Sequence, residues 1–274
     1  MVQSSKCSTK FRALLVFIVF STMLFGQPFE VAGILPSGAG FASSFNTVNP
    51  SCSNPASFCN APDFMSASAS QLWWIKEYSV YTVSSSFNVS KFSIGLQAGY
   101  FGKPSLYTEG LLALRLARKL EKIGSFGARL KLLGEKYPEE KQTMKPLADL
   151  GFIRDLSDYA SVGIFVQDAP LSKSASKEVQ FKISVGGFYE VSNWAKALMD
   201  IKFVGEKAYL YLGQSIMLGN KLCIGIGVGS RPMKMFFGAK FSVKNLSFAI
   251  SGQVHPELGV TNDFGIIYEF RQSK

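Results

Sequence analysis

The chain has 274 residues and a formal net charge of +10, yet only 18% of its residues are charged. Its 24 phenylalanines and 25 glycines favour β-structure, because aromatic side chains suit pleated surfaces. Lys and Arg are spread singly along the chain, and this excludes the clustered basic surface expected of a nucleic-acid-binding protein.

The N-terminus has the pattern of a secretory signal peptide. Basic residues precede an uncharged apolar run, ALLVFIVFSTMLFG, at residues 13–26. This run is shorter than the roughly 20 residues that a helix needs to span a bilayer. The small residues of VAG at 31–33 suit cleavage by signal peptidase. We expect residues 1–33 to be removed on export; an uncleaved N-terminal anchor is the alternative.

Residues 34–70 are poor in charge and rich in Ser, Ala, Asn and Pro, which predicts an irregular, plug-like segment. Cys52 and Cys59 flank SNPASF within it. In an oxidising, exported setting these two cysteines predict a local disulfide, with two free thiols as the alternative. Cys223 lies within LCIGIGVG and is expected to be a small strand side chain. Because the sequence has no CxxC pair and no Cys/His cluster, we expect neither metal nor cofactor.

From residue 71 to 271, alternating segments follow one another with turn residues between them, which predicts antiparallel strands. The clearest are KFSIGLQAGY (91–100), FGARLKLL (126–133), VQFKISVGGFYEV (179–191), KLCIGIGVGS (221–230), MFFGAKFSV (235–243) and DFGIIYEF (263–270). We count about twelve strands, with a range of ten to fourteen given ordinary boundary errors.

Two segments are ambiguous. EGLLALRLARKLEKI (109–123) has leucines four residues apart, as in a helix, but it also alternates, and the period alone does not decide. Its position directly before another alternating segment favours a strand. Residues 137–158 contain two prolines and several charges, and they predict a long connection with room for one short helix.

Serial alternation fits a soluble β-protein, which buries its apolar side, or a transmembrane barrel, which turns that side to lipid. Two features favour the barrel: the weaker side of each strand carries small residues and single cations, and segments near ten residues suit tilted spanning strands. Aromatic residues also crowd the ends of the first strands and predict an interfacial girdle: Trp73, Trp74, Tyr78, Tyr81, Phe87, Tyr100, Phe101 and Tyr107. The prediction is an all-β, antiparallel transmembrane β-barrel over 71–271.

The closing segment SGQVHPELGVTNDFGIIYEF (251–270) resembles the last hairpin of FadL-like outer-membrane barrels. That group includes long-chain fatty-acid transporters and the PorV/PorQ-type proteins of type IX secretion. Residues 159–191, KLEKIGSFGARLKLL (119–133) and SNPASF (53–58) are similar to other elements of the group, in the same order. The resemblance implies a barrel with a plug in the outer membrane. The chain is short for the fourteen strands typical of the group.

Enzymatic chemistry finds little support in the sequence. The single histidine, His255, lies in QVHPELG, and a nucleophilic site would need a serine oriented by such a base. Barrel-embedded lipases place that serine two positions after the histidine, where this chain has Glu257. GxGxG at 225–229 lies inside an alternating segment, not at a strand-to-helix turn, so nucleotide binding is not predicted. We expect no enzyme and no cofactor.

The weaker side of the strands carries basic residues that would face the lumen: Arg115, Lys119, Arg129, Lys131, Lys182 and Lys240. Few acidic residues share that side, mainly Glu190 and Glu269. One interpretation is a positive lumen that attracts anions such as carboxylates. The other is that these cations pair with carboxylates that the sequence does not place, because lone buried charge is costly.

The leading functional hypothesis is an outer-membrane barrel that passes small hydrophobic or amphipathic molecules, with lipid and such a substrate as partners. The second is a PorV/PorQ-like docking component of a secretion system, with exported proteins as partners. The third is a soluble exported β-protein that binds a ligand in its interior. None of the three involves nucleic acid.

Overall fold

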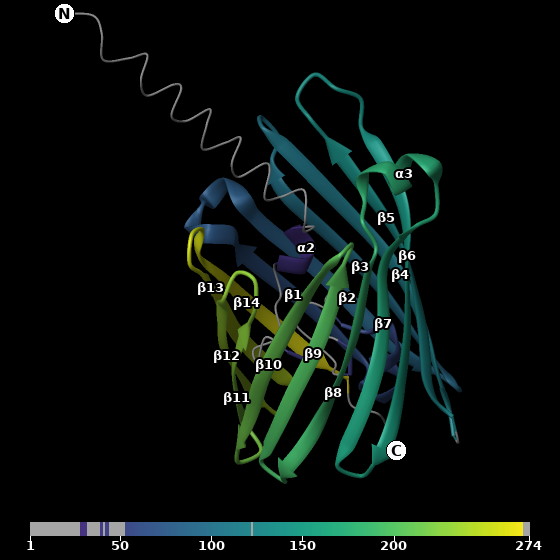
Figure 1. Cartoon of the computed structure of the whole chain (residues 1–274), viewed down its shortest axis with the longest axis vertical. Coiled ribbons are helices and arrows are strands. Elements are labelled where there is room, and N and C mark those ends of the chain that lie inside the picture. Colours follow the sequence, from purple (N-terminus) through teal and green to yellow (C-terminus); the bar gives the residue numbers. More distant parts are fainter. Residues whose placement is uncertain (1–27, 32–38, 41, 44–52, 122, 271–274) are drawn as a thin grey trace, which may run out of the picture.

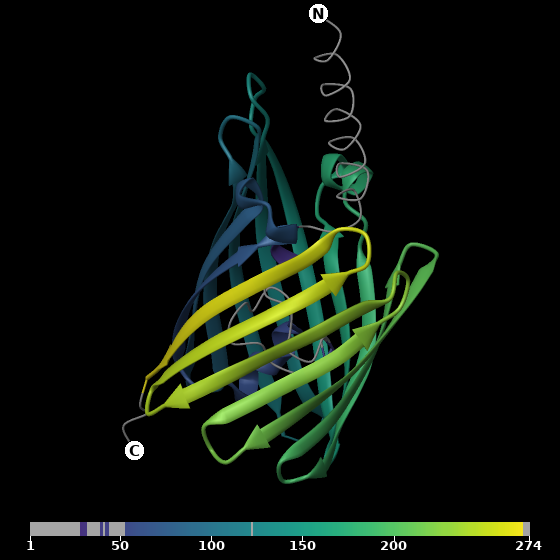
Figure 2. The ribbon, with the colours of Figure 1, turned by 90° about the vertical axis from the view of Figure 1, so that its left-hand side faces the viewer.

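The computed structural model describes residues 28–31, 39–40, 42–43, 53–121 and 123–270. Within them, fourteen antiparallel strands form one closed barrel in which each strand pairs with its sequence neighbours and β1 pairs with β14. The barrel closes at the pair Phe64 and Glu269, so both chain ends of the barrel lie at the same rim (Figures 1 and 2).

The strands run from 8 to 15 residues in length. Their bounds are β1 (Phe64–Gln71), β2 (Ser79–Val89), β3 (Phe92–Lys103), β4 (Tyr107–Leu120), β5 (Gly124–Lys136), β6 (Thr143–Ser157), β7 (Ala160–Pro170), β8 (Lys182–Ser192), β9 (Ala195–Val204), β10 (Lys207–Leu218), β11 (Leu222–Gly229), β12 (Lys234–Val243), β13 (Leu246–His255) and β14 (Gly259–Glu269). Short helices are α2 (Pro28–Val31), η2 (Pro55–Asn60), η3 (Leu72–Trp74), η4 (Lys76–Tyr78) and α3 (Lys173–Glu178).

The predicted count of about twelve strands is wrong by two. One missed strand, β1, lies mostly inside the segment 34–70, because its sequence FMSASASQ offers little apolar contrast. The other, β6, occupies the expected long connection 137–158. Its charged residues Lys145 and Asp149 disguise it, since they point into the barrel and find partners there. The ambiguous segment 109–123 forms a strand, as predicted.

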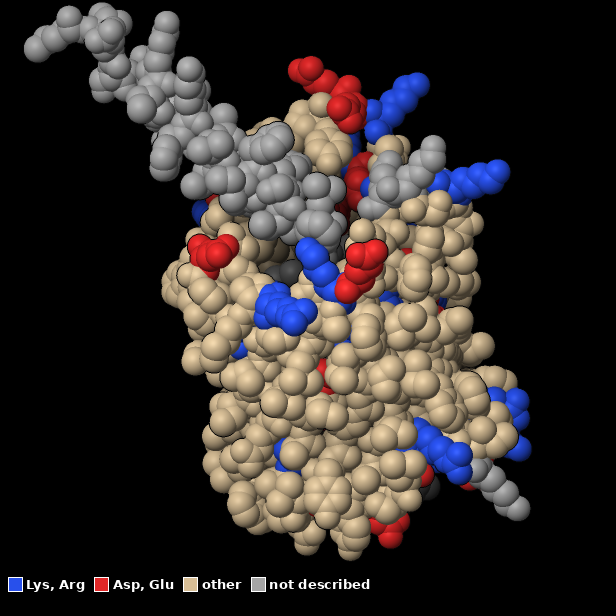
Figure 3. Space-filling view, viewed as in Figure 1, with Lys and Arg blue, Asp and Glu red and all other residues tan. Residues whose placement is uncertain are grey.

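The two sides of each strand differ in the predicted way. On β4 the outward Leu112, Leu114 and Leu116 are 60%, 48% and 47% exposed, whereas the alternate residues are buried. On the face that Figure 3 shows, a broad band across the middle is almost free of charge, and charged side chains gather toward the two ends. An apolar outer wall around a polar interior is typical of barrels that face lipid. Among the described residues, no helix is long and apolar enough to cross a membrane.

The two ends of the barrel are built differently. At one, the loop end, the longer connections 72–78, 137–142 and 171–181 join the strands, and α2 lies there too (Figure 1). At the other, the turn end, the strands are joined by tight turns (Figure 2).

The predicted aromatic girdle is only half correct. Trp74, Tyr81 and Tyr100 are 67%, 55% and 42% exposed on the outside, and Phe87 is exposed as well. The other four aromatic residues instead form or contact an apolar cluster inside the loop end: Trp73, Tyr78, Phe101 and Tyr107. Trp73 and Tyr78 belong to the connection 72–78, which packs against the cluster, whereas Phe101 lies on the inward side of β3.

Candidate functional site

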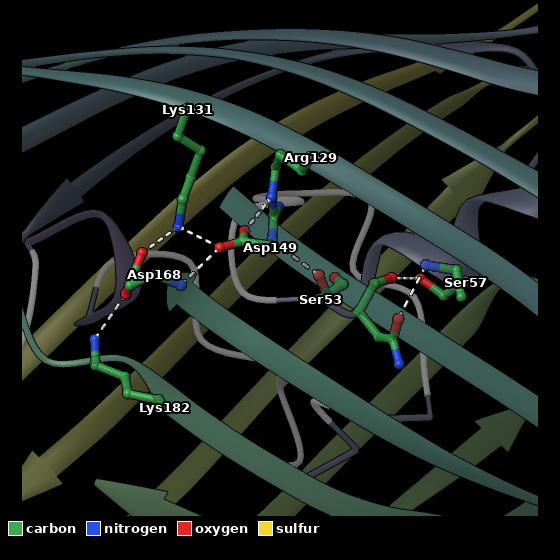
Figure 4. Close-up of polar contacts among 9 residues, drawn as sticks. Ser53, Ser57, Arg129, Lys131, Asp149, Asp168 and Lys182 are labelled. Carbon is green, nitrogen blue, oxygen red and sulfur yellow. Dashed lines mark hydrogen bonds and ion pairs between the residues drawn. The ribbon is translucent and has the colours of Figure 1, made fainter. Parts of the chain in front are cut away.

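A chain of ion pairs crosses the inner wall of β5, β6, β7 and β8 (Figure 4). Arg129 Nε donates to Asp149 Oδ2 at 2.6 Å, and Lys131 Nζ lies 2.7 Å from Asp149 Oδ1. Lys131 also pairs with Asp168, whose second oxygen lies 3.0 Å from Lys182 Nζ. All five side chains are buried. We call these five residues the ion-pair chain; its charges alternate along four neighbouring strands.

The ion-pair chain shows that three of the predicted lumen cations are paired with carboxylates. Three of them, Arg129, Lys131 and Lys182, share two carboxylates, Asp149 and Asp168, so a single positive charge remains on the group. Removing one member of a buried ion pair typically costs about 3–5 kcal/mol, because its partner is left as an uncompensated charge. These cations therefore stiffen the wall and are poorly placed to attract a free anion.

Arg115 of β4 is different. Its side chain is 1% exposed, and the guanidinium lies over the ring of Phe58, 3.7 Å from the ring centre. Its Nη2 donates to the carbonyl of Ser85 at 3.2 Å, whereas Nε and Nη1 have no hydrogen-bond partner among the described residues. Stacking on an aromatic ring replaces part of the lost hydration of the cation. Arg115 thus fixes η2, which carries Phe58, to the wall.

Residues 53–60 lie inside the barrel and fill part of the lumen, and Asn54 is their central anchor. Its Nδ2 donates to the carbonyls of Ala42, Phe152 and Ile164 at 2.7, 3.2 and 3.0 Å. Its Oδ1 accepts from the backbone N–H of Ala56 at 2.9 Å and so caps η2. One buried amide therefore joins η2, the turn at Ala42 and two barrel strands.

The plug lies directly on a path of inward glycines. A Cβ on Gly151 would collide with the Asn54 side chain, and one on Gly163 would collide with the carbonyl of Ala42. Gly127, on the neighbouring strand β5, is equally crowded by Pro55 and Ala56. Backbone can approach a wall this closely only where the wall has no side chain. Gly127, Gly151 and Gly163 thus form a seat for the plug.

Asp200 of β9 completes the attachment of the plug. Its carboxylate is fully buried and accepts from the backbone N–H groups of Gly40 and Ala42, the latter at 3.1 Å. Hydrogen bonds to a charged acceptor are stronger than neutral ones. Asp200 thus attaches Gly40 and Ala42 to β9, and Asn54 attaches residues 53–60 to β6 and β7.

An apolar cluster closes the loop end of the lumen above the plug. The mouth cluster, as we name it, consists of Phe29, Leu72, Val80, Phe101, Leu111, Leu133, Leu147 and Ala175, all buried. Aromatic rings continue it: Tyr78 stacks on Phe101 with centroids 6.0 Å apart, and Trp73 meets Tyr78 edge-on at 6.1 Å. Burial raises the pKa of Tyr78, so its hydroxyl stays neutral. The mouth cluster is thus a buried apolar cluster with aromatic rings packed against it.

The outer wall carries a shallow apolar groove of about 990 Å³ across β1–β6. Small outward residues, including Ala67, Ser85 and Ala98, make the floor, and Leu96, Leu112 and Leu130 are among its sides. Leu147 belongs both to this groove and to the mouth cluster. The wall between the two apolar regions is therefore one strand thick.

The remaining predicted residues lie elsewhere. Lys119 is exposed near the turn end of β4, and Lys240 is half-buried on the inward side of β12. Glu190 pairs with Lys196 instead of a lumen cation.

His255 Nδ1 accepts from the backbone N–H groups of Glu257 and Leu258, at 3.2 Å each, which gives it a role in the turn. Among the described residues, no group of His, Cys, Asp and Glu could hold a metal ion.

The predicted disulfide lies at the edge of what the structure describes. Cys59 is a free thiol 3.9 Å from the carbonyl of Phe126, whereas Cys52 falls outside the described residues. Burial raises the pKa of the Cys59 thiol. Most of the predicted signal peptide also lies outside the described residues; only 28–31 belong to them.

Four functional residues escaped the sequence: Asn54, Asp149, Asp168 and Asp200. Asn54 had a signal in the SNPASF element, but only as part of a resemblance. Asp149 would have been found if β6 had been recognised, since it shares the inward side of that strand with Lys145. Asp168 has a left-handed backbone conformation with φ of 61°, which breaks the strand pattern around it.

No protein-family model matches the chain. No curated protein matches it either. Among solved structures, the Pseudomonas putida toluene transporter TodX aligns over 88% of this chain and 98% of its own, with a TM-score of 0.60 and 12% identity. The Ralstonia pickettii toluene transporter TbuX aligns over 89% of this chain and 100% of its own, with a TM-score of 0.62 and 11% identity. The CymD monoaromatic hydrocarbon channel aligns over 81% of this chain and 92% of its own, with a TM-score of 0.58 and 11% identity. At such identities the likeness establishes the barrel fold alone.

Proposed function

We propose that this protein is an outer-membrane barrel through which small hydrophobic molecules pass without covalent chemistry. The observation that carries the proposal is the mouth cluster: a closed barrel with an apolar outer wall holds a buried apolar cluster, with aromatic rings packed against it, at its loop end. Barrels of this kind have short periplasmic turns and longer external loops, so the mouth cluster would face the exterior. The similarity to hydrocarbon channels and transporters supports the proposal.

In this proposal the plug and the mouth cluster have separate roles. The plug, fixed by Asn54 and Asp200, obstructs the axial path for water and ions. An apolar molecule gains free energy on leaving water for the mouth cluster, at roughly 25 cal/mol per Å² of apolar surface buried. It would then leave beside the plug or across the wall toward the outer groove, where Leu147 separates the two regions. Diffusion down a gradient suffices for either route.

Two experiments test the proposal. Purified protein in liposomes should accelerate entry of toluene and of a labelled fatty acid relative to protein-free liposomes; equal rates for both would contradict passage of hydrophobic molecules. Fractionation of cells should place the protein with outer-membrane lipid. Recovery in a soluble fraction without detergent would instead favour an exported ligand-binding protein. Co-purification with exported proteins, in the absence of any uptake, would favour docking.

A further inference from the structure

Two arginines interrupt the apolar pattern of the outer wall. Along β4, three outward leucines are followed by Arg118, which is exposed. Along β6, outward apolar residues are followed by Arg154, which is exposed as well. On the fourteen described strands, the other outward position that carries a charge is Lys136, at the loop end of β5. All three are cations, and a cation on a lipid-facing surface is costly unless it reaches a polar partner.

The two arginines lie at similar distances from the turn end. Arg118 is two residues before the end of β4 at Leu120, and Arg154 is three residues before the end of β6 at Ser157. At about 3.3 Å per residue, both α-carbons lie within roughly 10 Å of a turn. A long basic side chain near a membrane surface extends its charge toward the headgroups. Because β4 and β6 both pair with β5, the two arginines flank a single strand.

A second apolar groove on the outer wall begins beside Arg118. It measures about 530 Å³, extends from β3 to β7, and has Arg118 among its lining residues. Ala128 of β5 lies near the middle of the lining, and its cross-strand neighbours on the outer face are Leu116 and Leu150. A small side chain between two large ones makes the depression. We call it the turn-end groove.

Aromatic rings lie where the turn-end groove meets the arginines. Arg118 is the cross-strand neighbour of Phe126, whose ring centre lies 4.7 Å from that of Phe152. The next outward residue after Phe152 is Arg154. The guanidinium of Arg118 also lies over the ring of Phe92, 5.2 Å from its centre. Rings and cations side by side are typical of the level of the lipid headgroups, and here an apolar groove continues from them.

We infer that the turn-end groove and the two arginines bind one anionic phospholipid, such as phosphatidylglycerol, from the leaflet at the turn end. The guanidinium groups of Arg118 and Arg154 hold the phosphate through paired N–H donors, and one acyl chain lies along the groove over Ala128. Basic residues beside an apolar membrane surface recognise anionic headgroups in this way. The inference goes beyond the proposed function: it needs the barrel in a bilayer, but not the passage of any molecule.

The charge of the site favours an anionic lipid over a zwitterionic one. Within the part of the chain that the structure describes, neither Arg118 nor Arg154 forms an ion pair. The acidic Glu121 and Asp158 follow the ends of β4 and β6, and neither pairs with these arginines. Phosphatidylethanolamine carries an ammonium group that two guanidinium groups repel, whereas phosphatidylglycerol carries none.

Native mass spectrometry of the full protein in detergent tests the inference, with phosphatidylglycerol and phosphatidylethanolamine of identical acyl chains as probes. We expect one phosphatidylglycerol to bind with about tenfold higher affinity than phosphatidylethanolamine. The double variant Arg118→Gln with Arg154→Gln should lose about tenfold or more of the affinity for phosphatidylglycerol, because both cations near the phosphate are gone. Equal affinities of the unaltered protein for the two lipids, or an unchanged double variant, would overturn the inference.

Lys136→Gln is the matched control. Lys136 is also an exposed, outward cation, but it lies at the loop end of β5, away from the turn-end groove. Its replacement should leave phosphatidylglycerol binding unchanged. A loss as large as that of the double variant would mean that the lipid responds to total charge, and would overturn the inference. The shift in gel mobility on heating confirms that each variant is a folded barrel.

The acyl chain is tested separately from the phosphate. Ala128→Leu fills the middle of the turn-end groove and should weaken phosphatidylglycerol binding several-fold through overpacking. An excess of glycerol phosphate should not displace the lipid. Displacement by glycerol phosphate, or full affinity in Ala128→Leu, would reduce the site to a phosphate site and overturn the lipid assignment. Toluene uptake by the double variant should equal that of the unaltered protein, so loss of lipid binding and loss of the proposed function are distinguishable.

Discussion

The plug region and the mouth cluster, both inside the lumen, are held by different kinds of contact. The plug region is polar: Asn54, Asp200 and Arg129, whose Nη2 donates to the carbonyl of Ser53 at 3.2 Å, hold the plug residues through directional contacts. The mouth cluster is apolar, and its contacts have no required direction. Directional contacts lose most of their value after a small displacement, whereas apolar contacts can be exchanged for others. The comparison teaches that the contacts of the plug residues require one geometry, whereas those of the mouth cluster do not.

The largest expected effect comes from removing the plug altogether. Deletion of residues 34–60 takes away Asn54 and the segment that carries Phe58, and it should convert a low-conductance barrel into an open pore. Single-channel recording in planar bilayers measures the change. Conductance equal to that of the intact protein would mean that the plug does not obstruct the lumen.

The next effect concerns the ion-pair chain. Asp149→Ala removes the partner of Arg129 and one partner of Lys131, and it should lower the free energy of unfolding by about 3–5 kcal/mol. Denaturant unfolding in detergent gives the value. Glu190→Ala is the control, because its pair with Lys196 is partly exposed and should contribute below about 1 kcal/mol. Similar losses for the two variants would contradict the role of the buried chain.

A smaller effect is expected at the glycine seat. Gly163→Ala directs a methyl group at the carbonyl of Ala42 and should cost about 1–3 kcal/mol through overpacking while it displaces the plug. Gly110→Ala faces open space and should leave both stability and conductance unchanged. The prediction fails if Gly163→Ala behaves like Gly110→Ala in both measurements.

The smallest effect is expected in the mouth cluster. Phe101→Leu keeps an apolar side chain of similar size, so it should lower stability by less than about 1.5 kcal/mol. It removes the ring that stacks on Tyr78, and uptake of toluene into liposomes should slow by a few fold because an aromatic contact is worth about 0.5–1.5 kcal/mol. A large loss of stability without a change in uptake would assign the mouth cluster a structural role only.

The sequence by itself determined the fold class. The period of two places Leu112, Leu114 and Leu116 on one side of a strand and Arg115 on the other, whatever the strand pairs with. The sequence-based prediction missed strands in which the difference in polarity between the two sides is small or is hidden by charged residues. In β1, Ser and Ala alternate with little difference in polarity, and in β6 the charged residues are neutralised by neighbours far away in the chain.

Only the tertiary structure decided the partners. Arg129 and Asp149 are 20 residues apart, and Gly40 and Asp200 are 160 apart, so no local pattern joins them. The registers of fourteen strands bring these groups within reach, and closure of the barrel removes the water that would otherwise solvate them. The tertiary structure also places part of the expected aromatic girdle inside, because Trp73 and Tyr78 of the connection 72–78 pack against Phe101.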